Sequence, residues 1–87
     1  MIKKIILYGS KARGDYEEES DIDLLFISDS ALPREKKSEI YDVVYEIEVD
    51  HDVIASVVFI SEPDFRSKES HFLRQVKKEG ITLWSRE

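Results

Sequence analysis

The chain has 87 residues, a formal net charge of −6 and no cysteine. This length is that of one domain, residues 1–87, with room for one small hydrophobic core. Without cysteine the chain has neither a disulfide nor a thiolate metal site. The negative charge argues against direct nucleic-acid binding, which needs a basic face. There is no signal peptide and no apolar run near the roughly 20 residues of a membrane span, so we expect a cytoplasmic protein that does not contact a membrane.

The first third of the sequence predicts two strands joined by a glycine turn, a short helix and an acidic loop. Apolar residues fill both predicted strands, and three consecutive glutamates lie in the loop between them. The expected elements are a strand over residues 2–8, a helical turn over 10–14, a loop over 15–20 and a strand over 21–27.

Two carboxylates open the second predicted strand. Asp21 and Asp23 are two positions apart, so on a strand they point to the same face. Mg²⁺ is commonly held by one or two carboxylates together with substrate phosphates. Gly9 permits a close backbone approach to a phosphate, Ser10 adds a hydroxyl, and Arg13 either contacts a phosphate or pairs with one of the aspartates. This pattern predicts a site for metal-dependent transfer of a phosphoryl or nucleotidyl group.

The remaining two thirds predict an α+β fold in two layers. We expect a small mixed or antiparallel sheet of three to four strands, with the helices packed on one of its faces. The longest predicted helix carries an apolar stripe at three- and four-residue spacing, formed by Ile40, Val43, Val44 and Ile47. The expected elements are a helix over 33–48, a turn over 49–52, a strand over 53–60, a capped turn over 61–66, a helix over 69–79 that Gly80 ends, and a strand over 81–84.

Two short motifs resemble a known signature. Gly9-Ser10-x-Ala-Arg13-Gly14, followed by Ser20-Asp21-Ile22-Asp23-Leu24, resembles the signature of the DNA polymerase beta-like nucleotidyltransferase superfamily. The closest resemblance is to its minimal nucleotidyltransferase (MNT-type) branch, whose members are often paired with HEPN-domain proteins. Each motif alone is weak, but the two together at this spacing are specific, and the resemblance extends loosely to the C-terminus.

The sequence departs from the pattern of this family in two places. Members usually carry a helix before the first strand, and here Met1 is almost at that strand. One face of the sheet is then either covered by a partner or a second copy, or closed by repacking of a smaller fold. Members also usually place a third carboxylate, which serves as general base, on a strand antiparallel to the one with the aspartate pair. The equivalent position here is near Ser56, and Asp52 is the nearest candidate to replace that carboxylate.

The resemblance implies an enzyme that transfers a nucleoside monophosphate to an acceptor hydroxyl. The expected group is AMP, and its expected source is ATP. Mg²⁺ would be held by Asp21 and Asp23, and the triphosphate would be seated by Gly9, Ser10 and Arg13. The acceptor would be a HEPN-type toxin, which makes this chain the antitoxin, and self-association of the chain is a further expectation.

The alternative is a module of low or absent activity that neutralises a HEPN partner by binding it, because the third carboxylate is missing. A small-molecule transferase is the weaker third reading, since the chain has no added helical domain to hold such an acceptor.

Overall fold

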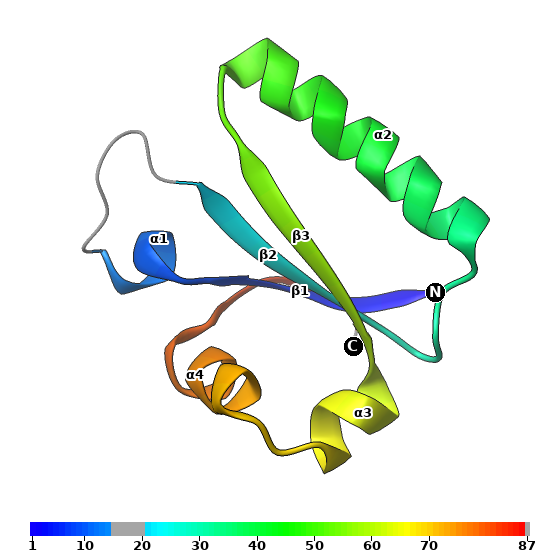
Figure 1. Cartoon of the computed structure of the whole chain (residues 1–87), viewed down its shortest axis with the longest axis vertical. Helices are drawn as coiled ribbons and strands as arrows, with labels where there is room; N and C mark the ends of the chain where they lie inside the picture. The colour runs from blue at the N-terminus through cyan, green and yellow to red at the C-terminus, as the bar shows by residue number, and fades with distance from the viewer. Residues whose placement is uncertain (15–20, 87) are drawn as a thin grey trace.

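The computed structural model describes residues 1–14 and 21–86, with the backbone alone at Ser10. Ser20 and the glutamates of the predicted acidic loop therefore lie outside the described residues. None of the described helices is both long and apolar enough to cross a membrane. In chain order the elements are β1 (Ile2–Tyr8), α1 (Ser10–Arg13), β2 (Ile22–Ser28), α2 (Arg34–His51), β3 (Ala55–Ser61), α3 (Glu62–Ser67), α4 (His71–Glu79) and β4 (Ile81–Ser85) (Figure 1).

The described strands form one mixed sheet in the order β3-β2-β1-β4. β1 is antiparallel to both β2 and β4, whereas β2 and β3 are parallel and connected through α2. The predicted α+β class with a small mixed sheet is confirmed. The expectation that β3 runs antiparallel to the strand with the aspartate pair was wrong, because an 18-residue helix between the two strands returns the chain to the end where β2 begins.

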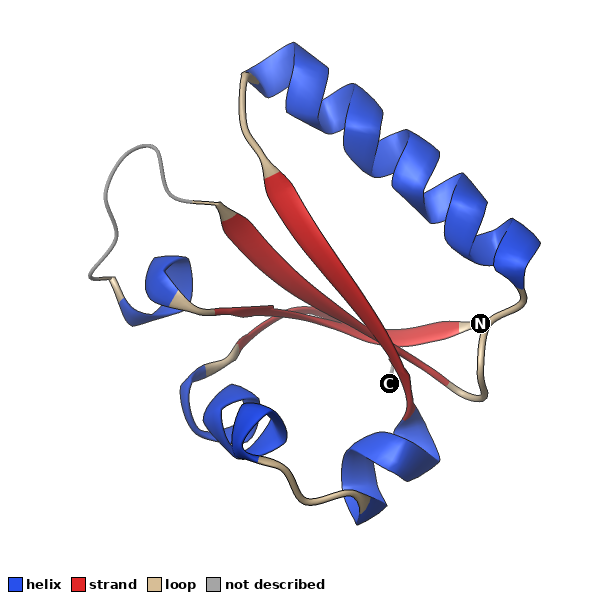
Figure 2. Ribbon diagram, in the orientation of Figure 1, coloured by secondary structure: helices blue, strands red, loops and turns tan. Residues whose placement is uncertain are grey.

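Helices cover both faces of the sheet, whereas the sequence led us to expect them on one face (Figure 2). Side chains alternate along each strand, so Ile6, Leu25 and Ile27 face α4 and form the buried core with Val76. The intervening residues of β1 and β2 face α2 on the opposite side. The error arose because the apolar runs of β1 and β2 are continuous, and such runs do not say how the helices are divided between two faces.

The long helix α2 carries the predicted apolar stripe, but it buries none of its side chains fully. Within this stripe Val43 is 57% exposed and Ile47 is 49% exposed. The helix also continues through His51, across the predicted turn, and ends at Asp52, which takes a left-handed conformation with φ of 52°.

The two C-terminal helices begin at serine caps, in line with the sequence prediction for the first of them. The Ser61 hydroxyl accepts from the Asp64 N–H at 3.4 Å, and the Ser70 hydroxyl accepts from the Leu73 N–H at 3.1 Å. Gly80 ends α4, and its N–H donates to the Val76 carbonyl at 2.7 Å. A β-carbon at Gly80 would lie 2.6 Å from Ile6, so this close packing of α4 on β1 needs a glycine.

Asp29, just after β2, holds both ends of the described chain together. Its carboxylate lies 3.8 Å from the amino group of Met1 and accepts from the Arg86 guanidinium at 3.1 Å. The Arg86 N–H also donates to the Lys3 carbonyl at 2.9 Å, which continues the pairing of β4 with β1.

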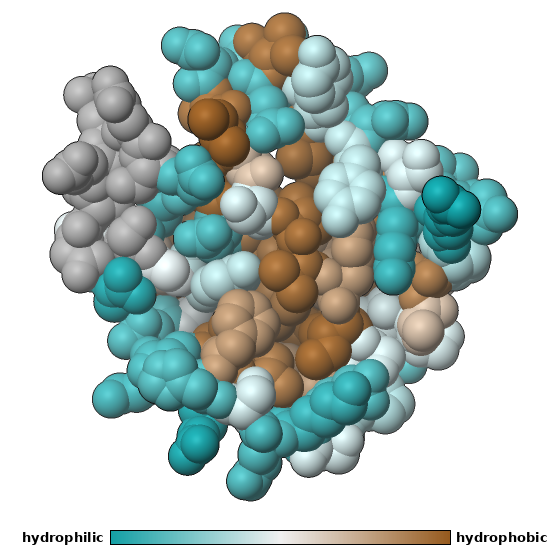
Figure 3. Space-filling view, in the orientation of Figure 1, coloured by the Kyte–Doolittle hydropathy of each residue, from teal (hydrophilic) through white to brown (hydrophobic). Residues whose placement is uncertain are grey.

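The edge strand β3 carries exposed apolar side chains on the face seen in Figure 3. They gather along the middle of that view and are bordered by hydrophilic residues. Val58 on β3 is 37% exposed, and Ile54 just before β3 is 62% exposed.

Candidate active site

The candidate site begins at the turn that joins β1 to α1. Gly9 has a φ of 78°, in the left-handed region that glycine adopts without strain. Its carbonyl accepts from the N–H groups of Ala12 and Arg13, both at 3.1 Å, which closes the turn and starts the short helix. The predicted glycine turn is therefore present, and its geometry requires the residue that the sequence provides.

Asp23 lies directly against this turn. A β-carbon built at Gly9 would collide with the Oδ2 atom of Asp23 and would lie 3.3 Å from its Cγ. The register of the sheet explains this proximity, since Asp23 is paired with Tyr8, the residue that precedes Gly9. The carboxylate and the glycine turn thus converge on one place, as the sequence predicted.

Asp21 precedes β2 and is exposed at the same end of the sheet. Partial burial and the negative charge of Asp21 raise the pKa of Asp23 above its ordinary value, and the positive charge of Arg13 acts in the opposite direction. The two aspartates are therefore close enough to repel each other when both are ionised. A divalent cation would relieve this repulsion.

Tyr8 belongs to the same site, although the sequence analysis did not select it. Its ring meets Phe72 of α4 edge-on, with 5.2 Å between centroids. Burial, and then the charge of Asp23, raise the pKa of the Tyr8 phenol. The hydroxyl therefore stays protonated near neutral pH and can donate a hydrogen bond. Its position directly before Gly9 was the signal that could have identified it.

Arg13 links α1 to α4. Its guanidinium donates to the Glu79 carboxylate at 3.3 Å, and it also acts electrostatically on Asp23. The sequence left open a phosphate contact or a structural pairing with an aspartate. The structure adds Glu79 as a partner that lies 66 positions away in the chain.

A hollow of about 350 Å³ opens beside the Gly9 turn. Tyr8, Gly9 and Arg13 form one side, and α4 supplies His71, Phe72 and Gln75 on the other. These α4 residues were not among those predicted from the sequence to form the site. No local motif marks them, because α4 joins the site only through packing of the folded chain.

Ser56 stands next to Asp23 in the parallel pairing of β2 and β3. Adjacent residues on parallel strands share a face, so this is the position where a third carboxylate would join the pair. Asp52 does not replace it from the strand face, because it caps α2 before β3 begins. Among the described residues, no group of three or more acidic or histidine side chains is arranged to hold a metal.

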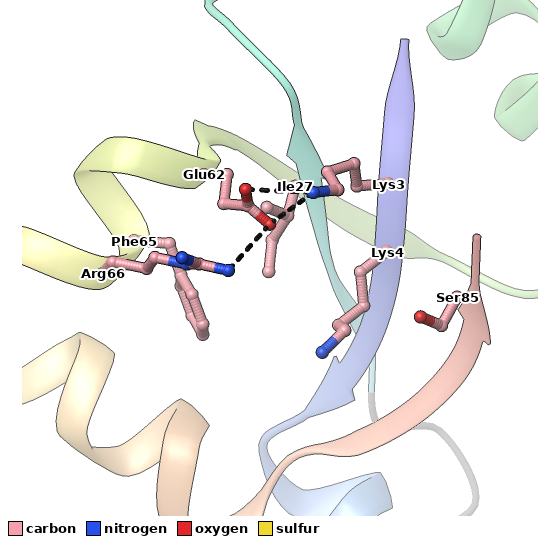
Figure 4. A pocket seen from close by; sticks show the side chains of 7 residues that line it. All are labelled: Lys3, Lys4, Ile27, Glu62, Phe65, Arg66 and Ser85. Carbon is pink, nitrogen blue, oxygen red and sulfur yellow. Dashed lines mark hydrogen bonds and ion pairs between the residues drawn. The ribbon is translucent and has the colours of Figure 1, made fainter. Parts of the chain in front are cut away.

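Another hollow, of about 120 Å³, lies at the opposite end of β1 (Figure 4). There Glu62 of α3 accepts from Lys3 at 3.0 Å and lies 3.7 Å from Arg66, while Lys4 and Ser85 point into the open space. This hollow has a single carboxylate that two cations already neutralise. It therefore lacks the paired acidic groups of the Gly9–Asp23 site.

Two archaeal proteins resemble this chain closely. Both come from Methanocaldococcus jannaschii and are provisionally named protein adenylyltransferases. The first is 39% identical over 84 residues, which cover 95% of this chain and 79% of the relative. The second is 28% identical over 82 residues, which cover 94% of this chain and 79% of the relative.

Solved structures share the fold over nearly the whole chain. A toxin–antitoxin complex with AMP-PNP gives a TM-score of 0.69 at 22% identity, covering 99% of this chain and 63% of the other. A complex of tri-AMPylated Shewanella oneidensis HEPN toxin with MNT antitoxin gives 0.60 at 20% identity, covering 98% and 58%. This chain thus spans about three fifths of the length of these solved chains.

The family described as Polymerase beta, Nucleotidyltransferase matches residues 1–87, which is the full length of the chain. Its match agrees with the mixed sheet and with the glycine turn that lies against the Asp23 carboxylate. The chain therefore belongs to the polymerase beta nucleotidyltransferase family.

Proposed function

We propose that this chain is a Mg²⁺-dependent nucleotidyltransferase that moves AMP from ATP to a hydroxyl of a HEPN-type protein, and so acts as its antitoxin. The observation that carries the proposal is the contact between the Asp23 carboxylate and the Gly9 turn. The names of the two archaeal relatives support adenylyl transfer. The HEPN toxin and MNT antitoxin complex among the fold neighbours supports the choice of partner.

The acidic pair suits a hard divalent cation. Asp21 and Asp23 offer only oxygen donors, and partial burial, followed by repulsion from Asp21, raises the pKa of Asp23. Bound there, Mg²⁺ would neutralise phosphate charge and orient the reacting oxygens. Both features are properties of the protein alone, so they can be tested without substrate.

The other residues of the site would position the substrates. Gly9 leaves room for phosphate oxygens to approach the backbone, and Arg13 offers a cation beside that turn. Tyr8 and Phe72 form an aromatic wall of the adjoining hollow. In the transfer, the acceptor oxygen bonds to the α-phosphorus, the bond from this phosphorus to the bridging oxygen breaks, and pyrophosphate leaves.

The transfer also releases the proton of the acceptor hydroxyl, which passes to solvent water when no side chain serves as base. Ser56 occupies the position beside Asp23 where a carboxylate base would stand, and a serine is not a base at neutral pH. This observation favours a second candidate function, in which the chain neutralises the HEPN-type protein by binding alone. The two functions share the fold and the partner, and they differ in whether AMP is transferred.

An isotope experiment tests the proposal. The chain and a HEPN-type protein are incubated with Mg²⁺ and ATP that is labelled at either the α- or the γ-phosphate. We expect label on the partner from α-labelled ATP only, because nucleotidyl transfer retains the α-phosphorus and releases the others. Asp23→Asn should abolish this labelling.

Inhibition of the partner is measured in the same samples. If Asp23→Asn abolishes labelling and inhibition together, transfer is the mechanism. If inhibition persists without labelling, the binding function replaces the proposed one. Label from γ-labelled ATP would contradict nucleotidyl transfer in favour of phosphoryl transfer.

A further inference from the structure

We propose that a cleft between α2 and the sheet binds a basic amphipathic helix from a partner protein. The cleft has a volume of about 530 Å³ and lies on the face of the sheet opposite Asp23. Its apolar walls are formed by Ile5, Leu24 and Phe26 of the sheet, Val43 and Ile47 of α2, and Leu83 of β4. The inference concerns this face alone and stands whether or not the chain transfers a nucleotide.

The helix α2 is fastened to β3 by two contacts of its side chains. Its Tyr41 ring meets Phe59 of β3 edge-on, with 5.5 Å between centroids, and its Glu48 carboxylate accepts from the Ala55 N–H at 2.8 Å. Both contacts are made with β3, the outer strand of the sheet. The cleft therefore opens on the other side of α2, toward β1 and β4.

The width of the sheet indicates that the occupant is a helix. Four strands about 4.8 Å apart make a surface roughly 15–20 Å wide, whereas one helix covers about 10 Å. Among the described helices, α3 and α4 lie on the opposite face of the sheet and α2 lies on this face (Figure 1). One more helix, lying beside α2 over β1 and β4, would complete the layer and bury the exposed sides of Val43 and Ile47.

The charge of α2 indicates that this helix is basic. From Glu39 to Asp50 the sequence has five acidic residues and no Lys or Arg. Glu39, Glu46 and Asp50 are seven and four positions apart, so they form one row along α2; we call this row the acidic rim. The rim lies beside Val43 and away from the side that contacts β3.

A second copy of this chain fits the cleft poorly. Two α2 helices packed together would bring their acidic rims close, and like charges at an interface oppose binding. A partner helix with Lys or Arg beside its apolar stripe would instead pair with Glu46 and Asp50, because Glu39 already lies 3.5 Å from Lys36 of the same helix. The apolar walls would supply most of the affinity, and the rim would select the charge of the partner.

Two designed 18-residue helical peptides test the inference. Both carry leucine at three- and four-residue spacing, and the flanking positions are lysine in one and glutamate in the other. We expect the lysine peptide to bind about tenfold more tightly at low salt in calorimetry, with the difference shrinking at high salt because screening weakens charge pairs. In NMR spectra it should shift the signals of Ile5, Leu24 and Leu83.

Matched variants locate the binding. The double variant Val43→Ser, Ile47→Ser changes side chains that are already half exposed, so it should fold and yet bind the lysine peptide at least about tenfold more weakly. Tyr45→Ser is the control, because Tyr45 is 65% exposed on the same helix and does not line the cleft. The control should bind like the unchanged protein.

Three results would overturn the inference. The first is equal binding of the two peptides, and the second is a set of NMR shifts confined to the other face of the sheet. The third is a dimer in light scattering that the double variant dissociates, since the occupant would then be a second copy. All of these readouts measure binding without ATP, so a failure here leaves the transfer proposal untouched, and the reverse also holds.

Discussion

The Asp23 carboxylate occupies the space that a side chain at Gly9 would need. Gly9→Ala should therefore impose two separate costs. The left-handed backbone disfavours alanine by roughly 1–2 kcal/mol, and the new methyl group would also push the carboxylate out of place. We expect a loss of stability in urea unfolding together with a loss of nucleotide transfer.

Gly14→Ala is the matched control for this prediction. Gly14 has a φ of 81°, close to that of Gly9, but a β-carbon there would meet no atom within 4 Å. Gly14→Ala should lose only the backbone cost, so the two variants should differ by the cost of displacing Asp23. Equal losses of stability in the two variants would show that the contact between Gly9 and Asp23 contributes nothing.

Asp23→Asn should stabilise the protein in the absence of metal while it abolishes transfer. Because the folded protein raises the pKa of Asp23, its ionisation costs stability as the pH rises through that value. The melting temperature of the variant in EDTA should exceed that of the unchanged protein at pH 7. The difference should vanish below the ordinary pKa of 3.8, where both side chains are uncharged.

Mg²⁺ should reverse the order of the two melting temperatures, that of the unchanged protein and that of Asp23→Asn. Binding to the native state stabilises a protein by mass action, so added Mg²⁺ should raise the melting temperature of the unchanged protein more than that of Asp23→Asn. Equal shifts in the two proteins would show that the cation does not bind at this carboxylate.

Ser56→Asp should add the carboxylate that the site lacks. Ser56 is exposed and is paired with Asp23 across the parallel strands, so a new acidic group there would face the existing pair. We expect tighter Mg²⁺ binding in calorimetry and faster transfer, since a carboxylate can act as a base. Val58→Asp on the same face, two positions further along β3, should give neither effect.

Glu62→Gln should change how stability depends on pH. The hydrogen bond from Lys3, together with the charges of Arg66 and Lys3, lowers the pKa of Glu62 from its ordinary value of 4.5. Its contribution to stability is therefore complete above pH 4.5 and is lost as the pH falls through the lowered value. The unchanged protein should unfold at a higher urea concentration than the variant at pH 7, and the two should converge in acid.

Asp64→Asn provides the comparison on the same helix. Asp64 lies 3.6 Å from Lys68, and both side chains are largely exposed, so screening leaves this pair little effect on stability. A pH profile of Glu62→Gln that matched that of Asp64→Asn would contradict the role given to the contact between Glu62 and Lys3.

The sequence could predict the centre of the site because that centre is local. Gly9 directly follows β1 and Asp23 lies on β2, fourteen positions later, and the alternation of a strand fixes which way the carboxylate points. The same reasoning could not predict which α4 residues join the site. Phe72 and Glu79 meet Tyr8 and Arg13 only because α4 packs across the first strand.

The arrangement of helices was also beyond local patterns. The apolar stripe of α2 was predicted correctly, but a stripe shows only that a surface is apolar, not that this chain covers it. Val43 and Ile47 are exposed because no described helix lies beside α2 over β1 and β4 on that face. β2 and β3 are parallel because α2 is long enough to return the chain to the end of the sheet where β2 begins. Hydrophobic patterns alone do not give the direction of a strand.

The contacts of Asp29 with Met1 and Arg86 have a practical consequence for handling this protein. Both ends of the described chain are held at the end of β1 that is remote from Gly9. A fluorophore, affinity tag or surface tether attached at this end of the sheet would therefore leave the aspartate pair facing the solution. Immobilised protein should accept nucleotide and partner as freely as protein in bulk solvent.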